Sequence, residues 1–361
     1  MTTPTVIPDH ALPQGCAAAV AAARSILFIT VSRIGDTLFA TPAIRAVAAA
    51  CPAARITVLG HPKRAEVFRN LPFIAGVGAI TKKTAPWRGR LGGKRHDLAF
   101  VYNFDAPLVA YALRVAGKVV AFRQRDEALN RRLFACVEPP AFQSEHAVPQ
   151  LLRLPAALGI AADGMRLAYR ADAAEMAAAR ARLVAAGCAQ AMPLIGLQVA
   201  SFPTKAYRDW PVEHFAALCE RIVARWPAAH FLIFGGAEEK RRTGWLKSTL
   251  GNRATLCAGK LSLRETAAMM GLTDCYVGID TGPTHLMSTW DIPMVAMYHC
   301  LSAAAHTGPL DHPLAHVLDH PATGSPRCGE TSAMAEISVD AVFATVEQAL
   351  AARMAGPAGA R

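Results

Sequence analysis

Residues 26–60 read ILFITVSRIGDTLFATPAIRAVAAACPAARITVLG, and this stretch decides the fold class of the chain. Its first six residues form a strand-length run of apolar and β-branched side chains, and residues 55–59 form a second such run. The segment between them has the length and spacing of helices. Continuous apolar strands that alternate with helices are typical of parallel sheets covered on both faces. The stretch therefore predicts a strand–helix–strand unit of an α/β protein.

The same alternation continues along the rest of the chain. Its pattern predicts further strands at 97–102, 119–122, 194–198, 230–234, 255–257, 275–279 and 294–297. The pattern restarts near residue 190, after a helix at 172–187 that has an Asp cap and a closing Gly.

The length predicts more than one domain, because 361 residues exceed the usual size of one hydrophobic core. We expect two doubly wound domains, each with a parallel sheet. The expected divisions are an N-terminal extension (1–24), a first domain (25–188), a second domain (189–337) and a C-terminal helix (338–354) that reaches back to the first domain.

The composition excludes a disordered chain, because 53% of the residues are hydrophobic and 18% are charged. The net charge of +11 is concentrated in one part of the chain: residues 61–132 hold 15 basic and 5 acidic side chains, a net charge of +10. Such an excess indicates an anionic partner, which is a nucleic acid, a membrane surface or a phosphorylated ligand, or else a solubilising face.

The cysteines and the N-terminus predict a cytoplasmic protein. Nine cysteines are scattered without a C-x-x-C pair, which predicts reduced thiols and neither a disulfide framework nor a zinc site. The first 15 residues lack a basic segment followed by an apolar run, so no secretory signal is expected. No uncharged run reaches the roughly 18 residues of a spanning helix, and any membrane contact is expected to be peripheral.

The segment SRIGDT at 32–37 follows directly after the first strand. Gly35 permits a turn there. Asp36 has two interpretations: it caps the next helix, or it presents a carboxylate at the ligand site as a general base.

Two segments of the second half follow strands in the same way. DTGPTH at 280–285 places Gly and Pro at a helix start, which suits a pyrophosphate or an ordinary capped helix. The loop QVASFPTKAYRDWP at 198–211 offers Ser201 and the cations Lys205 and Arg208, which suit phosphate oxygens. The alternative for this loop is a solvated segment anchored by its tryptophan.

The segment FGGAEE at 234–239 also follows a strand. Gly235 and Gly236 admit a nucleotide, and Glu238 or Glu239 accepts hydrogen bonds from ribose hydroxyls. Acidic residues that complement the helix dipole are the alternative. A group of histidines near the C-terminus is interrupted by prolines, so no metal site is predicted there (His306, His312, His316 and His320).

Together these segments resemble glycosyltransferase family 9, the ADP-heptose:lipopolysaccharide heptosyltransferases. The stretch 26–60 looks like that family's opening strand, G-D loop, Pro-containing helix and second strand. QVAS with RDWPVEHFAAL, FGGAEE and GIDTGPTHL follow in the family's order, and HTGPL and MAEISVDAV match near the C-terminus. The resemblance covers roughly residues 25–350. It implies a GT-B fold, in which two Rossmann-like doubly wound domains face a central cleft.

The resemblance also implies site residues. Asp36 aligns with the family's proposed catalytic base, and Arg208 stands where the family usually has a phosphate-binding Lys. The donor diphosphate is assigned to Ser201, Lys205, Arg208, Asp280, Thr281, Gly282, Pro283, Thr284 and His285, and the nucleoside to Gly235, Gly236 and Glu238. The acceptor is assigned to Arg33, Lys82, Lys83, Arg88, Arg90, Asn103 and Arg123. No cofactor and no metal are expected.

The implied function is inverting transfer of heptose from ADP-heptose to a phosphorylated glycolipid, the inner core of lipopolysaccharide, in the cytoplasm with peripheral contact at the inner membrane. One alternative is a sugar-nucleotide epimerase or hydrolase of the same fold. A basic nucleic-acid-binding protein is another, but the chain has only 7% aromatic residues and no motif of that class.

Overall fold

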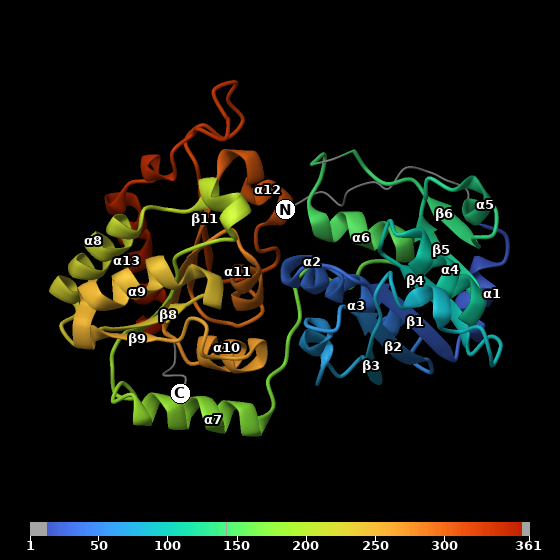
Figure 1. Ribbon diagram of the computed structural model, residues 1–361, viewed down its shortest axis with the longest axis horizontal. Helices are drawn as coiled ribbons and strands as arrows, with labels where there is room; N and C mark the ends of the chain where they lie inside the picture. The colour runs from blue at the N-terminus through green and yellow to red at the C-terminus, as the bar shows by residue number, and fades with distance from the viewer. Residues whose placement is uncertain (1–12, 142, 356–361) are drawn as a thin grey trace. The chain divides into compact units, whose positions relative to one another are not determined.

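The computed structural model describes residues 13–141 and 143–355, and the chain divides between Arg170 and Ala171 into two compact units (Figure 1). Each unit contains one parallel sheet of six strands among its described residues. This confirms the predicted α/β class with two doubly wound domains. No helix in the described ranges combines the length and the apolar character needed to cross a bilayer.

The first unit contains the strand–helix–strand stretch at residues 26–60. Its strands are β1 (Ser25–Thr30), β2 (Arg55–Gly60), β3 (Gly76–Ala79), β4 (His96–Val101), β5 (Ala116–Phe122) and β6 (Ala135–Val137). Its helices are α1 (Cys16–Ala22), α2 (Ile34–Phe39), α3 (Thr41–Ala50), α4 (Ala106–Val115), α5 (Glu127–Asn130) and α6 (Ala147–Ala156), with 3₁₀ helices η1 (Ala65–Phe68) and η2 (Ala85–Trp87).

The first sheet has the order β3-β2-β1-β4-β5-β6. Strand β1 lies in its middle, with Ile26 opposite Ile56 of β2 on one side and Leu98 of β4 on the other. The chain runs outward from β1 in one direction and then returns to continue from β4 in the other. The strand order therefore reverses between β1 and β4, and ligands of such sheets bind at the carboxyl ends of those two strands.

The second unit repeats this plan. Its strands are β7 (Leu194–Gln198), β8 (His230–Phe234), β9 (Ala254–Leu256), β10 (Cys275–Ile279), β11 (Met294–Tyr298) and β12 (Ala315–Asp319). Its helices are α7 (Ala173–Ala185), α8 (Val212–Arg225), α9 (Lys240–Leu250), α10 (Leu263–Met270), α11 (Gly282–Met287), α12 (Ala304–Thr307) and α13 (Val339–Ala355). Short 3₁₀ helices are η3 (Pro203–Arg208), η4 (Ala237–Glu239), η5 (Gly251–Arg253), η6 (Cys300–Ser302) and η7 (Met334–Glu336).

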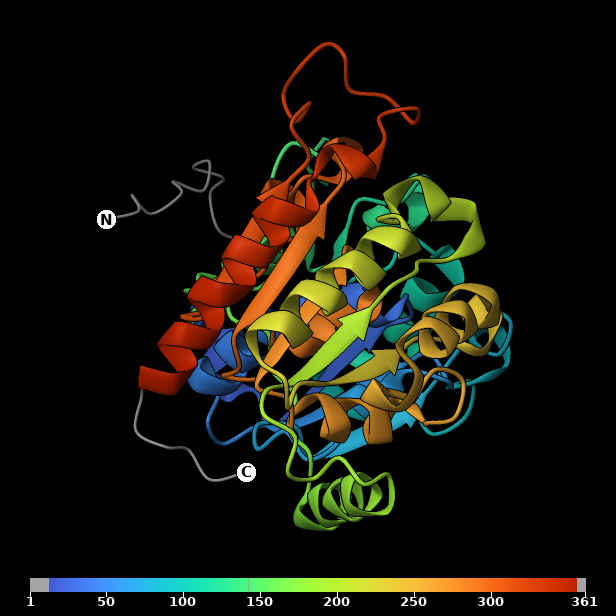
Figure 2. The ribbon, with the colours of Figure 1, turned by 90° about the vertical axis from the view of Figure 1, so that its left-hand side faces the viewer.

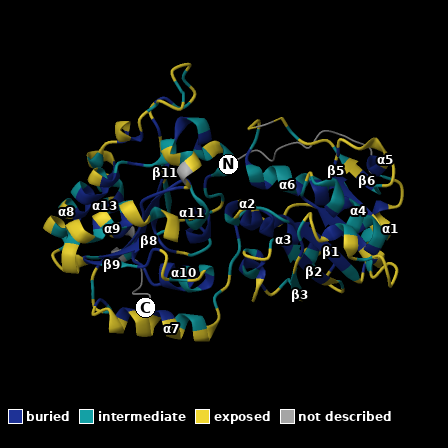
Figure 3. Ribbon diagram, in the orientation of Figure 1, coloured by how far each residue is buried: buried dark blue, intermediate teal, exposed yellow. Residues whose placement is uncertain are grey.

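The second sheet has the order β12-β11-β10-β7-β8-β9, so its reversal lies between β7 and β10. The inner strands of both sheets are largely buried (Figure 3), whereas the edge strands β3 and β12 are half-buried to exposed. The largest fully buried side chain of this unit is Trp210, whose indole Nε1 donates to the carbonyl of Ile337 at 2.8 Å. The tryptophan that the sequence suggested as a loop anchor therefore joins the start of α8 to the segment before α13.

The domain boundary lies earlier than the predicted residue 188, because α7 belongs to the second unit. The predicted Asp cap of this helix is present: Asp172 accepts from the backbone N–H of Glu175. Arg264 of α10, itself buried, forms an ion pair with Glu175 and thereby holds α7 against α10. Helix α7 thus packs on α10 of the second unit, a contact that no local pattern in the sequence reveals.

The two ends of the described chain each pack on their own unit. Helix α13 lies beside α8 (Figure 2), with Val342, Val346, Ala349 and Leu350 buried in the core of the second unit. From the sequence we expect this helix to reach back to the first domain, whereas in the structure it packs in the core of the second unit. Of the predicted N-terminal extension, residues 1–12 lie outside the described residues, whereas α1 packs on the first unit through the buried Cys16.

One expectation about the cysteines is wrong. Cys300 and Cys328 form a disulfide with Cα atoms 5.8 Å apart. The other seven cysteines are free thiols, as expected, and six of those are buried. The sequence did not indicate the bond because its partners are 28 residues apart and only the fold brings them together.

Candidate active site

Asp36 lies at the point of the first sheet where the strand order reverses, at the carboxyl end of β1. This residue lies in the first turn of α2, directly after β1, and its side chain is exposed. The hydroxyl of Ser32 donates to Asp36 Oδ2 at 2.8 Å. Asp36 therefore has an oriented carboxylate with access to solvent, which a general base acting on a bound hydroxyl requires.

The loop before Asp36 is held by two side chains from neighbouring strands. Asn103 follows β4; its Oδ1 accepts from Val31 N at 2.8 Å, and its Nδ2 donates to Val31 O at 3.0 Å. Arg64 follows β2, and its Nη1 donates to Ser32 O at 3.0 Å. Asn103 was predicted to bind the acceptor; in the structure its amide positions the Asp36 loop. Sequence reasoning missed Arg64, whose signal was its place just after β2 at the same edge of the sheet.

The other predicted acceptor residues of this edge differ in their partners. Lys82 Nζ lies 3.7 Å from Asp105 Oδ1. This ion pair is exposed and therefore weak, so Lys82 can leave Asp105 to bind an anionic ligand. Arg123 contacts Glu138 and also Glu127, at 2.7 Å. The hydrogen bond that Arg123 donates to Glu138, followed by the one it donates to Glu127, raises the pKa of Arg123 above its ordinary value. The charge of Arg123 is thus already balanced, whereas Arg33 and Lys83 are exposed near the same edge.

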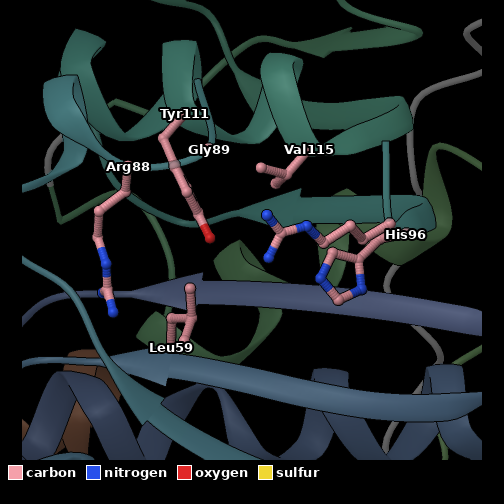
Figure 4. Close-up of a pocket in the computed structure, with 7 residues that line it drawn as sticks. Leu59, Arg88, Gly89, His96, Tyr111 and Val115 are labelled. Atoms are coloured by element: carbon pink, nitrogen blue, oxygen red, sulfur yellow. The ribbon is translucent and has the colours of Figure 1, made fainter. Parts of the chain in front are cut away.

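Two predicted acceptor residues, Arg88 and Arg90, lie in the connection from β3 to β4. Arg88 donates to the carbonyl of Ala79, and Arg90 donates to that of Pro86. Arg88 also lines a pocket of about 240 Å³ between this connection, α4 and the sheet (Figure 4). Both arginines thus have backbone partners in or next to their own connection.

The strand reversal of the second sheet joins Arg208, Asp280 and His285. Arg208 follows β7, and its Nη1 donates to Asp280 Oδ2 at 2.7 Å; His285 Nε2 lies 3.4 Å from Asp280 Oδ1. Burial alone would raise the pKa of Asp280, but the His285 hydrogen bond and the nearby charges of His285 and Arg208 outweigh it. The pKa of Asp280 therefore lies below its ordinary value.

The remaining residues of 280–285 divide into an inner and an outer set. Thr284 is buried, with its hydroxyl against the carbonyl of Ile279 and 2.9 Å from the hydroxyl of Tyr276. Thr281, Gly282 and Pro283 are only half-buried. A ligand of this loop would therefore meet the outer set, while Thr284 and Asp280 support the loop from within.

The loop after β7 is organised by a residue that sequence reasoning missed. Asp209 accepts from the backbone N–H of Ser201 at 2.8 Å and from its hydroxyl at 2.6 Å. Arg242 of α9 lies 3.3 Å from the other oxygen of Asp209. Ser201 thus shapes the loop, while Lys205 projects over the ring of Tyr207, 5.5 Å from its centroid.

The loop after β8 distinguishes the two glutamates that the sequence left open. Glu239 accepts from the backbone N–H of Gly236 at 2.5 Å, and its burial raises its pKa. Gly235 has φ of +149°, a backbone conformation that residues with a Cβ rarely adopt, so glycine is favoured there. Glu239 therefore caps the loop, and the exposed Glu238 is the carboxylate left for a ligand.

The C-terminal histidines hold turns. In His312 and in His320, Nδ1 accepts a hydrogen bond from the backbone N–H two residues ahead. The other ring nitrogen, Nε2, is hydrogen-bonded to a distant carbonyl, that of Trp290 and that of Ala333 respectively. Within 13–141 and 143–355 no three His, Cys, Asp or Glu side chains are grouped so that they would hold a metal ion.

The depressed pKa of Asp280 leads to an expected pH dependence of stability. Its ionised form contributes stability that is fully present above the unfolded pKa, near the ordinary value of 3.8, and is lost as the pH falls through the lower folded pKa. We expect the stability difference between wild type and Asp280→Asn to shrink from about pH 5 to about pH 3. Urea unfolding across this range measures it; a constant difference would contradict the role of the ionised pair.

Comparison with known proteins gives one family. Residues 105–337 match the family model described as glycosyltransferase family 9 (heptosyltransferase). A curated relative, lipopolysaccharide heptosyltransferase 1 of Pseudomonas aeruginosa strain PAO1, is 27% identical over 293 residues, which cover 76% of this chain and 78% of the relative.

Two solved structures share the fold. The glycosyltransferase family 9 protein of Veillonella parvula superposes with a TM-score of 0.79 at 18% identity, covering 92% of this chain and 99% of its own. The ADP-heptose lipopolysaccharide heptosyltransferase II of E. coli superposes with a TM-score of 0.73 at 18% identity, covering 92% and 100%. At this identity the likeness shows a common fold for both units.

Proposed function

Because this chain belongs to glycosyltransferase family 9, and is therefore a glycosyltransferase, we propose that it transfers heptose from ADP-heptose to the inner core of lipopolysaccharide. The observation that carries the proposal is the set of side chains that lies at the strand reversal of each sheet. One reversal presents the carboxylate of Asp36, and the other presents the Arg208–Asp280–His285 cluster. Transfer from a nucleotide sugar needs two components: a base for the acceptor hydroxyl, and a cationic site that stabilises the leaving diphosphate. The first unit offers the base, and the second offers Arg208, which Asp280 holds in place.

On the acceptor side, Asp36 removes the proton of the attacking hydroxyl. That oxygen forms a bond to the anomeric carbon as the bond from this carbon to the diphosphate breaks, so the configuration inverts. The bond from Ser32 orients the carboxylate, and Asn103 and Arg64 hold the loop. The proton moves to Asp36 and the nucleoside diphosphate leaves.

On the donor side, negative charge grows on the leaving diphosphate. We assign its stabilisation to Arg208, to Lys205 and to the outer residues 281–283. Asp280 is acidic and cannot itself attract a phosphate, so its contribution is to position Arg208 and His285. Glu238, with the glycines 235 and 236, is assigned to the nucleoside. The proposed transfer uses no metal ion and no cofactor.

The acceptor that fits the first unit is a phosphorylated glycolipid. The basic excess of residues 61–132 lies in this unit, and Arg33, Lys82 and Lys83 are exposed at the Asp36 edge. We propose that these cations bind acceptor phosphates and that the enzyme works at the cytoplasmic face of the inner membrane.

The donor nucleotide is tested by thermal shift against ADP, UDP, GDP and CMP. We expect ADP to raise Tm most, because a ligand present at about 100 times its Kd adds about 2.7 kcal/mol to stability. Equal shifts for all four nucleotides would contradict an adenosine-specific site. In parallel, ADP release from ADP-heptose should depend on added lipopolysaccharide acceptor; release without acceptor would indicate the hydrolase or epimerase alternative.

A further inference from the structure

The β3–β4 connection, residues 81–95, has an unusual composition. Its sequence TKKTAPWRGRLGGKR contains six basic side chains and no acidic one (Lys82, Lys83, Arg88, Arg90, Lys94 and Arg95). It also carries the two most exposed large apolar side chains among the described residues, Leu91 at 85% and Trp87 at 74%. Exposure of two such large apolar side chains on one connection is unfavourable in water and indicates a surface with a partner.

This exposure belongs to a fixed backbone. Arg114 of α4 donates to the carbonyls of Ala85 and Arg88, at 2.6 and 3.1 Å. Within the connection, Arg95 donates to the carbonyl of Leu91 at 2.9 Å. The carbonyls on either side of Trp87 and at Leu91 are therefore held, and the two apolar side chains are presented outward by an ordered segment.

The charges are placed around the apolar side chains. The Arg90 guanidinium lies over the Trp87 ring, 4.8 Å from its centroid. Behind the connection, the pocket of Figure 4 is lined by Arg88 and Arg95, and the hydroxyl of Tyr111 points into it. Guanidinium and hydroxyl groups donate to phosphate oxygens. An exposed tryptophan in a basic segment suits the interface of a bilayer, where its ring lies at headgroup level and the cations meet anionic lipid.

We propose that residues 81–95 are a docking loop for an anionic lipid bilayer. Trp87 and Leu91 enter the interface, and the exposed cations that the proposed function does not assign to the acceptor bind the headgroup phosphates (Arg88, Arg90, Lys94 and Arg95). The loop also starts beside the candidate active site, since Lys82 pairs with Asp105, two residues after Asn103. Docking would thus hold the Asp36 edge close to a glycolipid anchored in the same bilayer. The inference deepens the proposed function and rests on it for the nature of that glycolipid.

The test is flotation with vesicles, in the absence of donor and acceptor. Wild type should bind vesicles of phosphatidylcholine mixed with phosphatidylglycerol, should bind pure phosphatidylcholine weakly, and should be released by salt. The partition coefficient of the double variant Trp87→Ser/Leu91→Ser onto these vesicles should be lower by about tenfold or more. Lys94→Gln should bind about fivefold less, given roughly 1 kcal/mol for each basic residue at an anionic surface.

The matched control is Trp245→Ser, at an exposed tryptophan of α9 in the second unit, which should bind as wild type does. Wild-type binding by the Trp87→Ser/Leu91→Ser variant, or no binding of wild type to phosphatidylglycerol vesicles, would overturn the proposal. Turnover with detergent-solubilised acceptor separates the two ideas. The double variant should keep that turnover, whereas a wild type that binds vesicles but never releases ADP would refute the proposed function alone.

Discussion

Replacement of Asp36 by Asn should lower kcat by about 10²–10⁴, the usual contribution of a positioned general base. The amide keeps the size of the side chain and still accepts the Ser32 hydrogen bond, but it no longer takes a proton from the acceptor hydroxyl. Because Asp36 is exposed and outside the core, the fold and the ADP-induced thermal shift should be retained. Steady-state ADP release with saturating acceptor measures the loss.

The control for Asp36→Asn is Asp163→Asn, at an exposed carboxylate of the same unit that lies 3.6 Å from Arg45. Its turnover should equal that of wild type. Near-normal kcat in Asp36→Asn would remove Asp36 from the mechanism. The helix cap that the sequence allowed as an alternative is not its role either, because the N-cap of α2 is Arg33 and Asp36 lies in the first turn.

Replacement of Arg208 by Ala should raise the KM for the donor by about 10- to 100-fold, since a hydrogen bond to a charged group contributes about 1.5–3 kcal/mol. The KM for the acceptor should not change. The variant should also be less stable, because Asp280 is only 3% exposed and keeps His285 as a partner without the Arg208 charge. Donor titration and urea unfolding measure the two effects separately.

Two further variants identify the cause. Arg208→Lys keeps the charge but not the planar fork, so it should recover part of the donor affinity. Arg221→Ala removes another arginine of the second unit, whose partner Asp340 is exposed, and should change neither donor KM nor stability by much. An unchanged donor KM in Arg208→Ala would show that Arg208 only neutralises Asp280.

The strands that sequence reasoning found and missed differ in their position in the sheets. The nine predicted strands include every inner strand, because inner strands of parallel sheets are buried on both faces and are continuously apolar. The three missed strands, β3, β6 and β12, are edge strands. Strand β3 reads GVGA, β6 has three residues, and β12 contains one of the histidines considered as metal ligands. Only their neighbours identify them as strands.

The candidate site shows the same division. The segments at the four relevant strand ends were found because glycine, proline and acidic residues after an apolar strand form a local pattern. The partners that orient them come from elsewhere in the chain: Arg64 for the Asp36 loop, Asp209 for Ser201, and Arg208 for Asp280. Sequence separations of up to 72 residues carry no local signal for such contacts.

By itself, the amino-acid sequence determined the α/β class, the two-domain plan, the family resemblance and the positions of the candidate ligand loops, since all of these follow from short-range patterns. The tertiary structure decided how those residues are used. It pairs Asp280 with Arg208, directs Asn103 to the backbone of Val31, and joins Cys300 to Cys328. It also turns a diffuse positive charge into an ordered basic loop with Trp87 and Leu91 exposed, because burial and hydrogen bonding depend on neighbours that only the fold supplies.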